Sequence, residues 1–361
     1  MQPPAVLPRL LGLLQQITQS RPITIDTASN APLCCPLPYN PRETRMQFSD
    51  IRRIGVLGAG TMGHGIAQVF ASRGYEVRLM DLNPEFLSRA LERIRKNLEL
   101  FERKGLATAE STQQTLSHIS ATTDLFEAFQ EADFVVEAVP EDLTLKKQAF
   151  AKLEEICPED TILASNTSTI RIADIGSTTR RPERVIGTHW MLAPHIRPLV
   201  EIIPSEKTSL ETIEVTRALI EKLGKVPIVA PDTPGFIVNR LQMGVFAQTL
   251  KLLEQGVSKE DIDKAWTYHL GPRYCLTGPI EAMDSMGLDT LYLACLYLAS
   301  VLNEPGLTPP EIVRKKFEAG ELGYKTGKGF YDYGGLSIDE LLDQRNEQLI
   351  HILKQLKLPV G

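Results

Sequence analysis

The stretch Ile54-Gly55-Val56-Leu57-Gly58-Ala59-Gly60-Thr61-Met62-Gly63 decides how the first part of this chain folds. An apolar run leads into a Gly-x-Gly-x-x-Gly turn, and an apolar helical pattern follows. This order is typical of a strand that feeds a dinucleotide-binding helix. Gly58 permits the tight turn, Gly60 lets the backbone approach a pyrophosphate, and Gly63 lets the helix pack closely on the strand. Free N–H groups at the start of the helix then bind the phosphates.

An acidic residue follows the next expected strand, residues 76–80. A glycine triplet alone is a weak signal, because glycines also cluster in ordinary loops. Here the second strand ends in Asp81, whose carboxylate is placed to accept both hydroxyls of an adenosine ribose. Leu82 and Asn83 come next and offer no cation for a 2′-phosphate. The pattern therefore predicts NAD rather than NADP as the cofactor.

Length and composition predict a globular protein of two domains. The chain has 361 residues, of which 43% are hydrophobic and 23% charged, proportions typical of folded domains. A net charge of -6 gives no reason to expect nucleic acid or an anionic membrane as a partner. The longest apolar run, residues 291–302, is too short to span a bilayer and is expected to form a buried helix. The five cysteines form no metal pattern and no disulfide framework, which favours a reducing compartment.

Residues 1–47 differ in composition from the rest of the chain. They are rich in Pro, Ser, Thr and Leu, and Asp26 is the only acidic residue before Glu43. Arginines with few acids fit a mitochondrial transit peptide. The interpretation we favour is a disordered extension, or translation that begins at Met46. We therefore expect a cytoplasmic protein, or a mitochondrial one if residues 1–45 are a transit peptide.

Hydrophobic periodicity divides the remaining chain. Residues 48–232 alternate short apolar runs with helical patterns, which predicts a Rossmann-type, doubly wound, mostly parallel sheet covered by helices. Beyond the turn at residues 231–235 helical patterns dominate, which predicts an all-α domain at 233–333 with a surface for a homodimer, and a C-terminal helix within 334–361. Strands are expected to end at residue 57 and to span residues 76–80, 134–139, 162–165, 185–189, 199–203 and 226–230. Helices are expected at residues 83–104, 143–157, 210–223, 236–253, 259–269, 279–302, 310–317 and 338–356.

Polar residues at the ends of expected strands suggest a catalytic site. Ser165 and His189 end two strands on the carboxyl side of the sheet, where ligands of such folds bind. Two prolines indicate that the chain then turns back, so that Glu201 can meet the imidazole. A histidine held by a carboxylate is a general base, able to take a hydroxyl proton while the carbon loses hydride.

The alternative is structural. The histidine is then an ordinary satisfied polar residue, and Glu201 is a buried carboxylate paired with a cation. His195 stands nearby and competes with His189 for the role. No His-x-x-x-His pair occurs, so this chemistry requires no metal.

From residue 51 to about residue 333 the chain resembles the L-3-hydroxyacyl-CoA dehydrogenase superfamily, which includes 3-hydroxybutyryl-CoA dehydrogenases. Several motifs match in order and spacing, and together they are specific. They are the Gly58 loop, Val136-Glu137-Ala138-Val139-Pro140-Glu141 with Lys146, Ala164-Ser165-Asn166-Thr167-Ser168, His189 with Glu201, Asp232-Thr233-Pro234-Gly235-Phe236-Ile237-Val238-Asn239-Arg240, Gly278-Pro279, and Lys325-Thr326-Gly327-Lys328-Gly329-Phe330-Tyr331.

The resemblance implies a reaction and a role for each matching residue. Hydride passes from C3 of a short-chain L-3-hydroxyacyl-CoA to NAD, which gives the 3-ketoacyl-CoA of fatty acid metabolism. His189 is the base and Glu201 its orienting partner, while Ser165 and Asn239 bind the reacting oxygen atoms. The cofactor contacts implied are Gly58, Gly60, Thr61, Met62, Gly63, Asp81, Glu141, Lys146 and Lys325. Asn97 and Lys104 match positions that contact CoA, although a solvated helix face shows the same residue types.

Two departures from the family pattern leave the substrate open. Leu192 replaces an Asn near cofactor and substrate, and an apolar side chain donates no hydrogen bond. Activity is then lowered or redirected, and one alternative is a catalytically weak NAD-binding structural or regulatory protein. Gly271-Pro272-Arg273-Tyr274 resembles the branch that acts on free hydroxy acids such as L-gulonate and L-carnitine. There the Arg meets a carboxylate; the other interpretation of Arg273 is an ion pair at the surface or between domains. A CoA thioester is the favoured substrate.

Overall fold

A computed structural model describes residues 50–334 and 337–360. The interpretation of residues 1–47 as an extension or targeting segment lies outside the described residues. The chain divides into two compact units, and the boundary falls between Ala247 and Gln248, inside helix α9 (Val238–Glu254). Each unit is described by itself, and the domain limits expected from the sequence stay a prediction.

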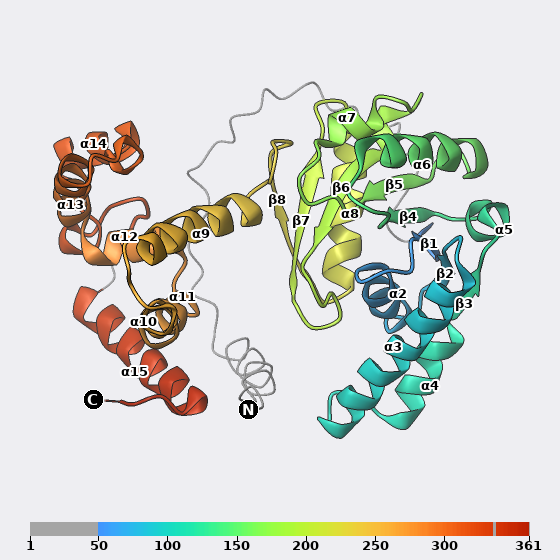
Figure 1. The fold of residues 1–361 in the computed structure, drawn as a ribbon, viewed down its shortest axis with the longest axis horizontal. Coiled ribbons are helices and arrows are strands. Elements are labelled where there is room, and N and C mark those ends of the chain that lie inside the picture. The colour runs from blue at the N-terminus through green and yellow to red at the C-terminus, as the bar shows by residue number, and fades with distance from the viewer. Residues whose placement is uncertain (1–49, 335–336, 361) are drawn as a thin grey trace. The chain divides into compact units, whose positions relative to one another are not determined.

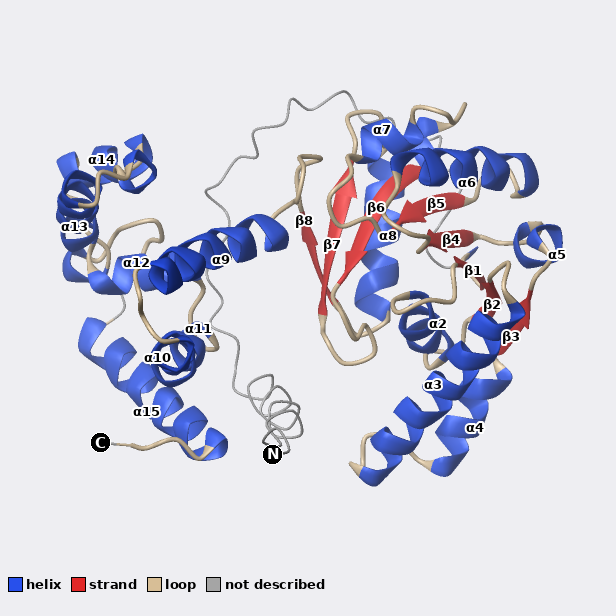
Figure 2. Cartoon of the chain, viewed as in Figure 1, coloured by secondary structure: helices blue, strands red, loops and turns tan. Residues whose placement is uncertain are grey.

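The first unit is built on an eight-stranded sheet with strand order β3-β2-β1-β4-β5-β6-β7-β8 (Figures 1 and 2). Only β6 and β7 pair antiparallel, and every other neighbouring pair is parallel. This arrangement confirms the expected Rossmann-type sheet. The strands are β1 (Arg53–Leu57), β2 (Glu76–Met80), β3 (Ile119–Thr122), β4 (Phe134–Glu137), β5 (Ile162–Ser165), β6 (Val185–Trp190), β7 (Leu199–Pro204) and β8 (Val226–Val229).

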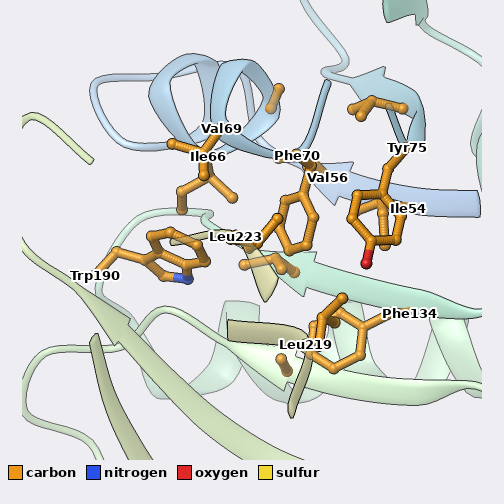
Figure 3. Close-up of a cluster of buried hydrophobic side chains, with 14 of the residues drawn as sticks. Ile54, Val56, Ile66, Val69, Phe70, Tyr75, Phe134, Trp190, Leu219 and Leu223 are labelled. Atoms are coloured by element: carbon orange, nitrogen blue, oxygen red, sulfur yellow. The ribbon is translucent and has the colours of Figure 1, made fainter. Parts of the chain in front are cut away.

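Helices cover both faces of this sheet. Successive side chains of each strand point to opposite sides, and the apolar side chains on each side pack against helices. On one face Ile54 and Phe134 pack with α2 and α8, as Figure 3 shows around Phe70 and Trp190. On the other face Val135 packs with α5, α6 and α7. The helices of this unit are α2 (Gly63–Ala71), α3 (Pro84–Arg103), α4 (Ala109–Ser117), α5 (Leu125–Phe129), α6 (Leu143–Ile156), α7 (Ile172–Gly176) and α8 (Leu210–Lys222).

The second unit, from Gln248 onward, is helical in its described part, as the sequence predicts. Its elements after α9 are α10 (Lys259–Ala265), a π-helical turn (Trp266–Leu270), α11 (Gly271–Tyr274), α12 (Pro279–Met286), α13 (Leu288–Val301), a 3-10 turn (Pro305–Leu307), α14 (Glu311–Glu318), a second 3-10 turn (Tyr324–Thr326) and α15 (Ile338–Leu356). The expectation of one helix over residues 279–302 is wrong. Gly287 has φ 97°, outside the helical region, so the chain breaks there into α12 and α13.

The expectation that residues 291–302 form a buried helix is also wrong for this chain. Leu288 is the only buried residue of α13, and several large apolar side chains of this helix are exposed to solvent. The exposed ones are Leu293, Leu296, Tyr297, Leu298, Val301 and, just beyond the helix, Leu302. Among the described residues, no helix combines the length and the apolar character needed to cross a membrane.

Candidate active site

The glycine turn follows the carboxyl end of β1, next to the carboxyl end of β4, and we call this edge of the sheet the crevice. The order of the strands reverses between these two neighbours, and ligands of open α/β sheets bind at such a point. Gly58 has φ 101° and donates its N–H to Met80 O at 2.8 Å. A Cβ on Gly63 would lie 1.7 Å from Gly58 O, whereas a Cβ on Gly60 would meet no atom within 4 Å. Gly63 thus serves close packing, and Gly60 borders the open space that a pyrophosphate requires.

Asp81 lies immediately after β2, beside this turn. One carboxylate oxygen accepts the N–H of Ala59 at 2.9 Å, and the other accepts the N–H of Asn83 at 3.0 Å. These bonds fix the carboxylate, and each oxygen keeps a lone pair for a ribose hydroxyl. The next side chain, Leu82, is 82% exposed. The residues present therefore fit an NAD-type adenosine ribose.

A buried carboxylate, Glu137, lies at the end of β4 on the other side of the crevice. Oε1 accepts the N–H of Val139 at 2.7 Å and the ammonium of Lys146 at 2.8 Å. Oε2 accepts the hydroxyl of Ser165 at 2.6 Å. Glu137 and Ser165 show no exposed surface, and the Lys146 side chain is 1% exposed. The structure thus brings Ser165 and Lys146 to one carboxylate, which the sequence analysis assigned no role.

The direction of the Ser165 hydrogen bond limits what this side chain can do. A hydroxyl carries one proton, and an ionised carboxylate only accepts. Ser165 gives its proton to Glu137 and accepts the N–H of Thr167 at 3.2 Å. Toward any further group Ser165 therefore offers a lone pair rather than a proton.

Glu141 joins the loop that follows β4 to the loop that follows β5. One of its oxygens accepts the hydroxyl of Thr167 at 2.7 Å and the N–H groups of Ser168 and Thr169 at 2.9 Å each. Burial raises the pKa of Glu141, but the Thr167 hydroxyl, Lys146 and these N–H groups outweigh it and hold the pKa below its ordinary value. Glu141 is thus an ionised side chain that shapes this rim of the crevice.

His189 and Glu201 face each other across β6 and β7. The antiparallel register pairs these two residues directly, and His189 Nδ1 lies 2.6 Å from Glu201 Oε2. The expectation that the chain turns back to bring the two together is confirmed. His189 is 6% exposed and Glu201 fully buried. Since the carboxylate can only accept, it fixes the proton on Nδ1 and leaves Nε2 as the basic nitrogen.

Glu201 is held ionised by the first turn of α9. Its Oε1 accepts the N–H groups of Ile237 and Val238 at 2.9 and 3.0 Å. Gly235 and Phe236, with φ 77° and 47°, turn the chain so that these groups point at the carboxylate. Burial raises the pKa of Glu201, but the hydrogen bonds from His189 and the two backbone N–H groups lower it below its ordinary value. The partial positive charge at a helix start acts in the same direction.

Two further side chains tie α9 and the preceding turn to the loop after β5. Asn239 Nδ2 donates to Ser168 O at 2.9 Å. Asp232 accepts the N–H groups of Ile172 and Ala173 at 2.7 and 2.8 Å, which caps α7. The motif around Asn239 therefore builds the wall next to the His189–Glu201 pair.

The other expected site residues have structural partners of their own. Asn97 Nδ2 donates to Gln68 Oε1 at 2.9 Å between α3 and α2, and Lys104 is the exposed C-terminal cap of α3. In the second unit Lys325 pairs with Asp289 at 2.9 Å, and Arg273 donates to Ala282 O at 3.0 Å. The contact of Arg273 is a hydrogen bond to a backbone carbonyl of its own unit, not the ion pair considered above, and the ligand-binding roles of these four residues stay predictions.

The segment between β6 and β7 carries Leu192 and His195. Leu192 is 63% exposed, so it leaves an apolar side chain where the family pattern has an amide. The buried Nδ1 of His195 has no hydrogen-bond partner among the described residues. Burial, with contributions from His64 and Lys225, lowers the pKa of His195 to about 4. Of the two competing histidines, only His189 has a carboxylate partner.

Sequence reasoning missed the role of Glu137 as the centre of a buried network. One signal was present, because a charged residue ends the apolar strand Phe134–Glu137. It missed the capping role of Asp232 as well, since that contact joins residues 60 positions apart. Such long-range pairs carry no local sequence pattern.

Known proteins resemble this chain over most of its length. Residues 53–233 match the family model described as 3-hydroxyacyl-CoA dehydrogenase, NAD binding domain, and residues 235–333 match its C-terminal domain. A probable 3-hydroxybutyryl-CoA dehydrogenase of Bacillus subtilis is 40% identical over 285 residues, 79% of this chain and 98% of that protein. The 3-hydroxybutyryl-CoA dehydrogenase of Clostridioides difficile is 37% identical over 78% of this chain and 99% of that protein. The crystal structure of a 3-hydroxyacyl-CoA dehydrogenase from Archaeoglobus fulgidus superposes with a TM-score of 0.72 at 36% identity, covering 85% of this chain and 100% of that one.

Proposed function

The chain belongs to the 3-hydroxyacyl-CoA dehydrogenase family and is an NAD-dependent oxidoreductase; on that premise we propose that its substrate is a short-chain L-3-hydroxyacyl-CoA, oxidised to the 3-ketoacyl-CoA. The observation that carries the proposal is the 2.6 Å contact between His189 Nδ1 and Glu201 Oε2. Bound NAD supplies the hydride acceptor. All other steps belong to side chains of the protein.

His189 acts as the general base. Its Nε2 takes the proton of the C3 hydroxyl while hydride leaves C3, and the ring becomes an imidazolium. Glu201 stabilises that charge and keeps the ring in the tautomer that leaves Nε2 free. In the reverse direction the same Nε2–H returns the proton to the ketone oxygen. Asn239, beside the pair, orients the reacting oxygen, while Ser165, which has no exposed surface, holds the loop after β5 by accepting the N–H of Thr167.

A CoA thioester is favoured over a free 3-hydroxy acid. The two relatives most similar in sequence among those described above carry the name 3-hydroxybutyryl-CoA dehydrogenase. Arg273, the residue that suggested a carboxylate substrate, already donates to Ala282 O. No specific contact among the described residues favours the purely structural NAD-binding alternative, although the exposed Leu192 stays compatible with it.

Substrate assays test the proposal. The purified protein is given NADH with acetoacetyl-CoA, and separately NAD with 3-hydroxybutyryl-CoA, L-gulonate or L-carnitine. We expect turnover with the two CoA thioesters only. Turnover confined to the free acids would contradict the proposed substrate. NADH binding without turnover of any of these compounds would favour the alternative, a structural NAD-binding protein.

We also propose a homodimer formed through the helical unit. The helix α13 exposes large apolar residues, among them Leu293, Tyr297 and Val301, and α9 has no buried residue. Monomeric proteins rarely expose apolar patches of this extent. Light scattering on the purified protein should give the mass of a dimer, and Val301→Glu with Tyr297→Glu should give a monomer. A monomeric wild type would overturn the proposal.

The proposed location is the cytoplasm, or the mitochondrion if residues 1–45 are a transit peptide. Unpaired cysteines, of which Cys157 is buried and Cys275 exposed, suit a reducing compartment. Fusing residues 1–45 to a fluorescent protein separates the two locations. A diffuse signal supports the cytoplasm, and a mitochondrial signal supports the transit peptide.

A further inference from the structure

Glu137 is the buried carboxylate next to the crevice that the proposed mechanism does not use. It forms an ion pair with Lys146, and both side chains are almost wholly buried. Removing a carboxylate and an ammonium from water costs several kcal/mol per ion, about as much as their attraction returns. A buried pair is therefore weak support for stability, and its position calls for another explanation.

Glu137 collects donors from three different segments. The N–H of Val139 comes from the loop after β4, the ammonium of Lys146 from α6, and the hydroxyl of Ser165 from the end of β5. The same ammonium reaches Val139 O at 3.2 Å and lies 3.4 Å from Glu141 Oε2. One side chain thus fixes the starts of both loops that form this rim of the crevice.

The register of the strands locates this network within the cofactor site. Leu57, Glu137, Ser165 and Gly187 lie side by side on β1, β4, β5 and β6. The catalytic pair begins two residues further along β6, at His189. A dinucleotide with its ribose at Asp81 and its phosphates at Gly60 must extend its other half across β4 and β5 to reach His189. Glu137 would therefore lie next to the nicotinamide half.

We propose that Glu137 is a positioning residue for the nicotinamide half of the cofactor, acting through Ser165 and Lys146 on the two loops that border the crevice rather than by direct contact. The inference rests on the proposed function for the direction in which the cofactor lies. Ser165 gives its proton to Glu137 and accepts the N–H of Thr167, so the carboxylate fixes the loop after β5 through this hydroxyl. The ammonium of Lys146 is held in place by the same carboxylate.

The variant Glu137→Gln tests this role. An amide carries one acceptor oxygen and one donor nitrogen, so its donor must face either the Ser165 hydroxyl or the Val139 N–H and Lys146 pair. Either arrangement changes the polarity of the network at nearly constant volume. The affinities of NADH and of ADP-ribose, which lacks nicotinamide, are then measured by titration calorimetry. We expect the Kd of NADH to rise about tenfold or more and that of ADP-ribose to change less than about twofold.

A matched control is Glu154→Gln. Glu154 is another buried carboxylate of the same unit, and it accepts the backbone N–H groups of Arg180 and Arg181 rather than groups at the crevice. This change is expected to lower the unfolding temperature without altering the ratio of the two affinities. If Glu137→Gln weakens NADH and ADP-ribose equally, or weakens neither, the positioning role is wrong.

Ser165→Ala keeps the proposal testable if Glu137→Gln does not fold. Loss of the hydroxyl should also weaken NADH selectively. Where both variants fold, the double variant should bind NADH no more weakly than the weaker single variant, because the two side chains act in one chain of contacts. Additive losses would contradict action through Ser165. Binding is measured without an acyl substrate, so a wrong substrate assignment would leave this result unaffected.

Discussion

Replacing Glu201 by Gln should disable the general base while the cofactor site stays intact. In the protein, Oε1 accepts two backbone N–H groups and Oε2 lies 2.6 Å from His189 Nδ1. The new amide can keep its oxygen toward the backbone, which turns its NH₂ group toward Nδ1. The ring must then accept at Nδ1 and carry its proton on Nε2, the atom that takes the substrate proton. The wrong tautomer therefore predominates.

The size of the effect follows from these contacts. In the variant, the active tautomer places the N–H at Nδ1 of His189 against the NH₂ group of the new amide, so two donors face each other. The hydrogen bond from Nδ1 to the charged carboxylate is also lost, and the two effects together cost about 4 kcal/mol. That cost corresponds to about a thousandfold in kcat.

The assay is NADH formation from NAD and 3-hydroxybutyryl-CoA, with the Kd of NADH measured separately. Glu154→Gln, a change at a buried carboxylate away from the crevice, is the control and should keep full activity. A kcat for Glu201→Gln within about threefold of wild type would refute the reasoning.

Two further predictions concern the glycine turn and a buried histidine. Gly63→Ala should destabilise the protein by about 3 kcal/mol, because its Cβ would lie 1.7 Å from Gly58 O. Gly60→Ala should fold normally yet bind NADH more weakly, and equal unfolding temperatures for the two variants would contradict this contrast. The pKa of His195 is lowered to about 4 in the folded protein, whereas its ordinary value in an unfolded chain is about 6.5. As the pH drops between these two values, the unfolded chain binds a proton that the folded protein does not, so the free energy of unfolding falls. His195→Gln should show a smaller drop in unfolding temperature between about pH 7 and pH 5, and an equal drop would refute the role given to this ring.

Much of the fold follows from local sequence pattern. The glycine turn, Asp81 and the alternating apolar strands predict the parallel sheet, and Asn83 before Pro84 predicts the start of α3, where Asn83 Oδ1 accepts the N–H of Glu85. The strand β3 escaped prediction because Ile119–Thr122 is a short edge strand with little apolar content. The break at Gly287 escaped as well, since a single glycine inside a helical pattern does not by itself mark a break; its φ of 97° ends α12.

The functional site can be predicted from the sequence only in part, because some of its contacts join residues far apart in the chain. That the chain turns back between His189 and Glu201 follows from the prolines between them, and the pairing of β6 with β7 confirms it. The network around Glu137 joins residues up to 28 positions apart, and its meaning depends on which atom donates. The direction of a hydrogen bond is fixed by neighbours in space, so the sequence alone did not reveal that Ser165 donates to Glu137.

The most direct test of the account is His189→Asn, with cofactor binding and turnover measured on the same preparation. The shorter amide side chain can still donate to Glu201 but offers no basic nitrogen to the substrate. The account predicts a Kd for NADH within about threefold of wild type and a loss of turnover of at least about a thousandfold. Substantial residual turnover at unchanged NADH affinity would show that another group takes the proton, and the assignment of the His189–Glu201 pair would be wrong.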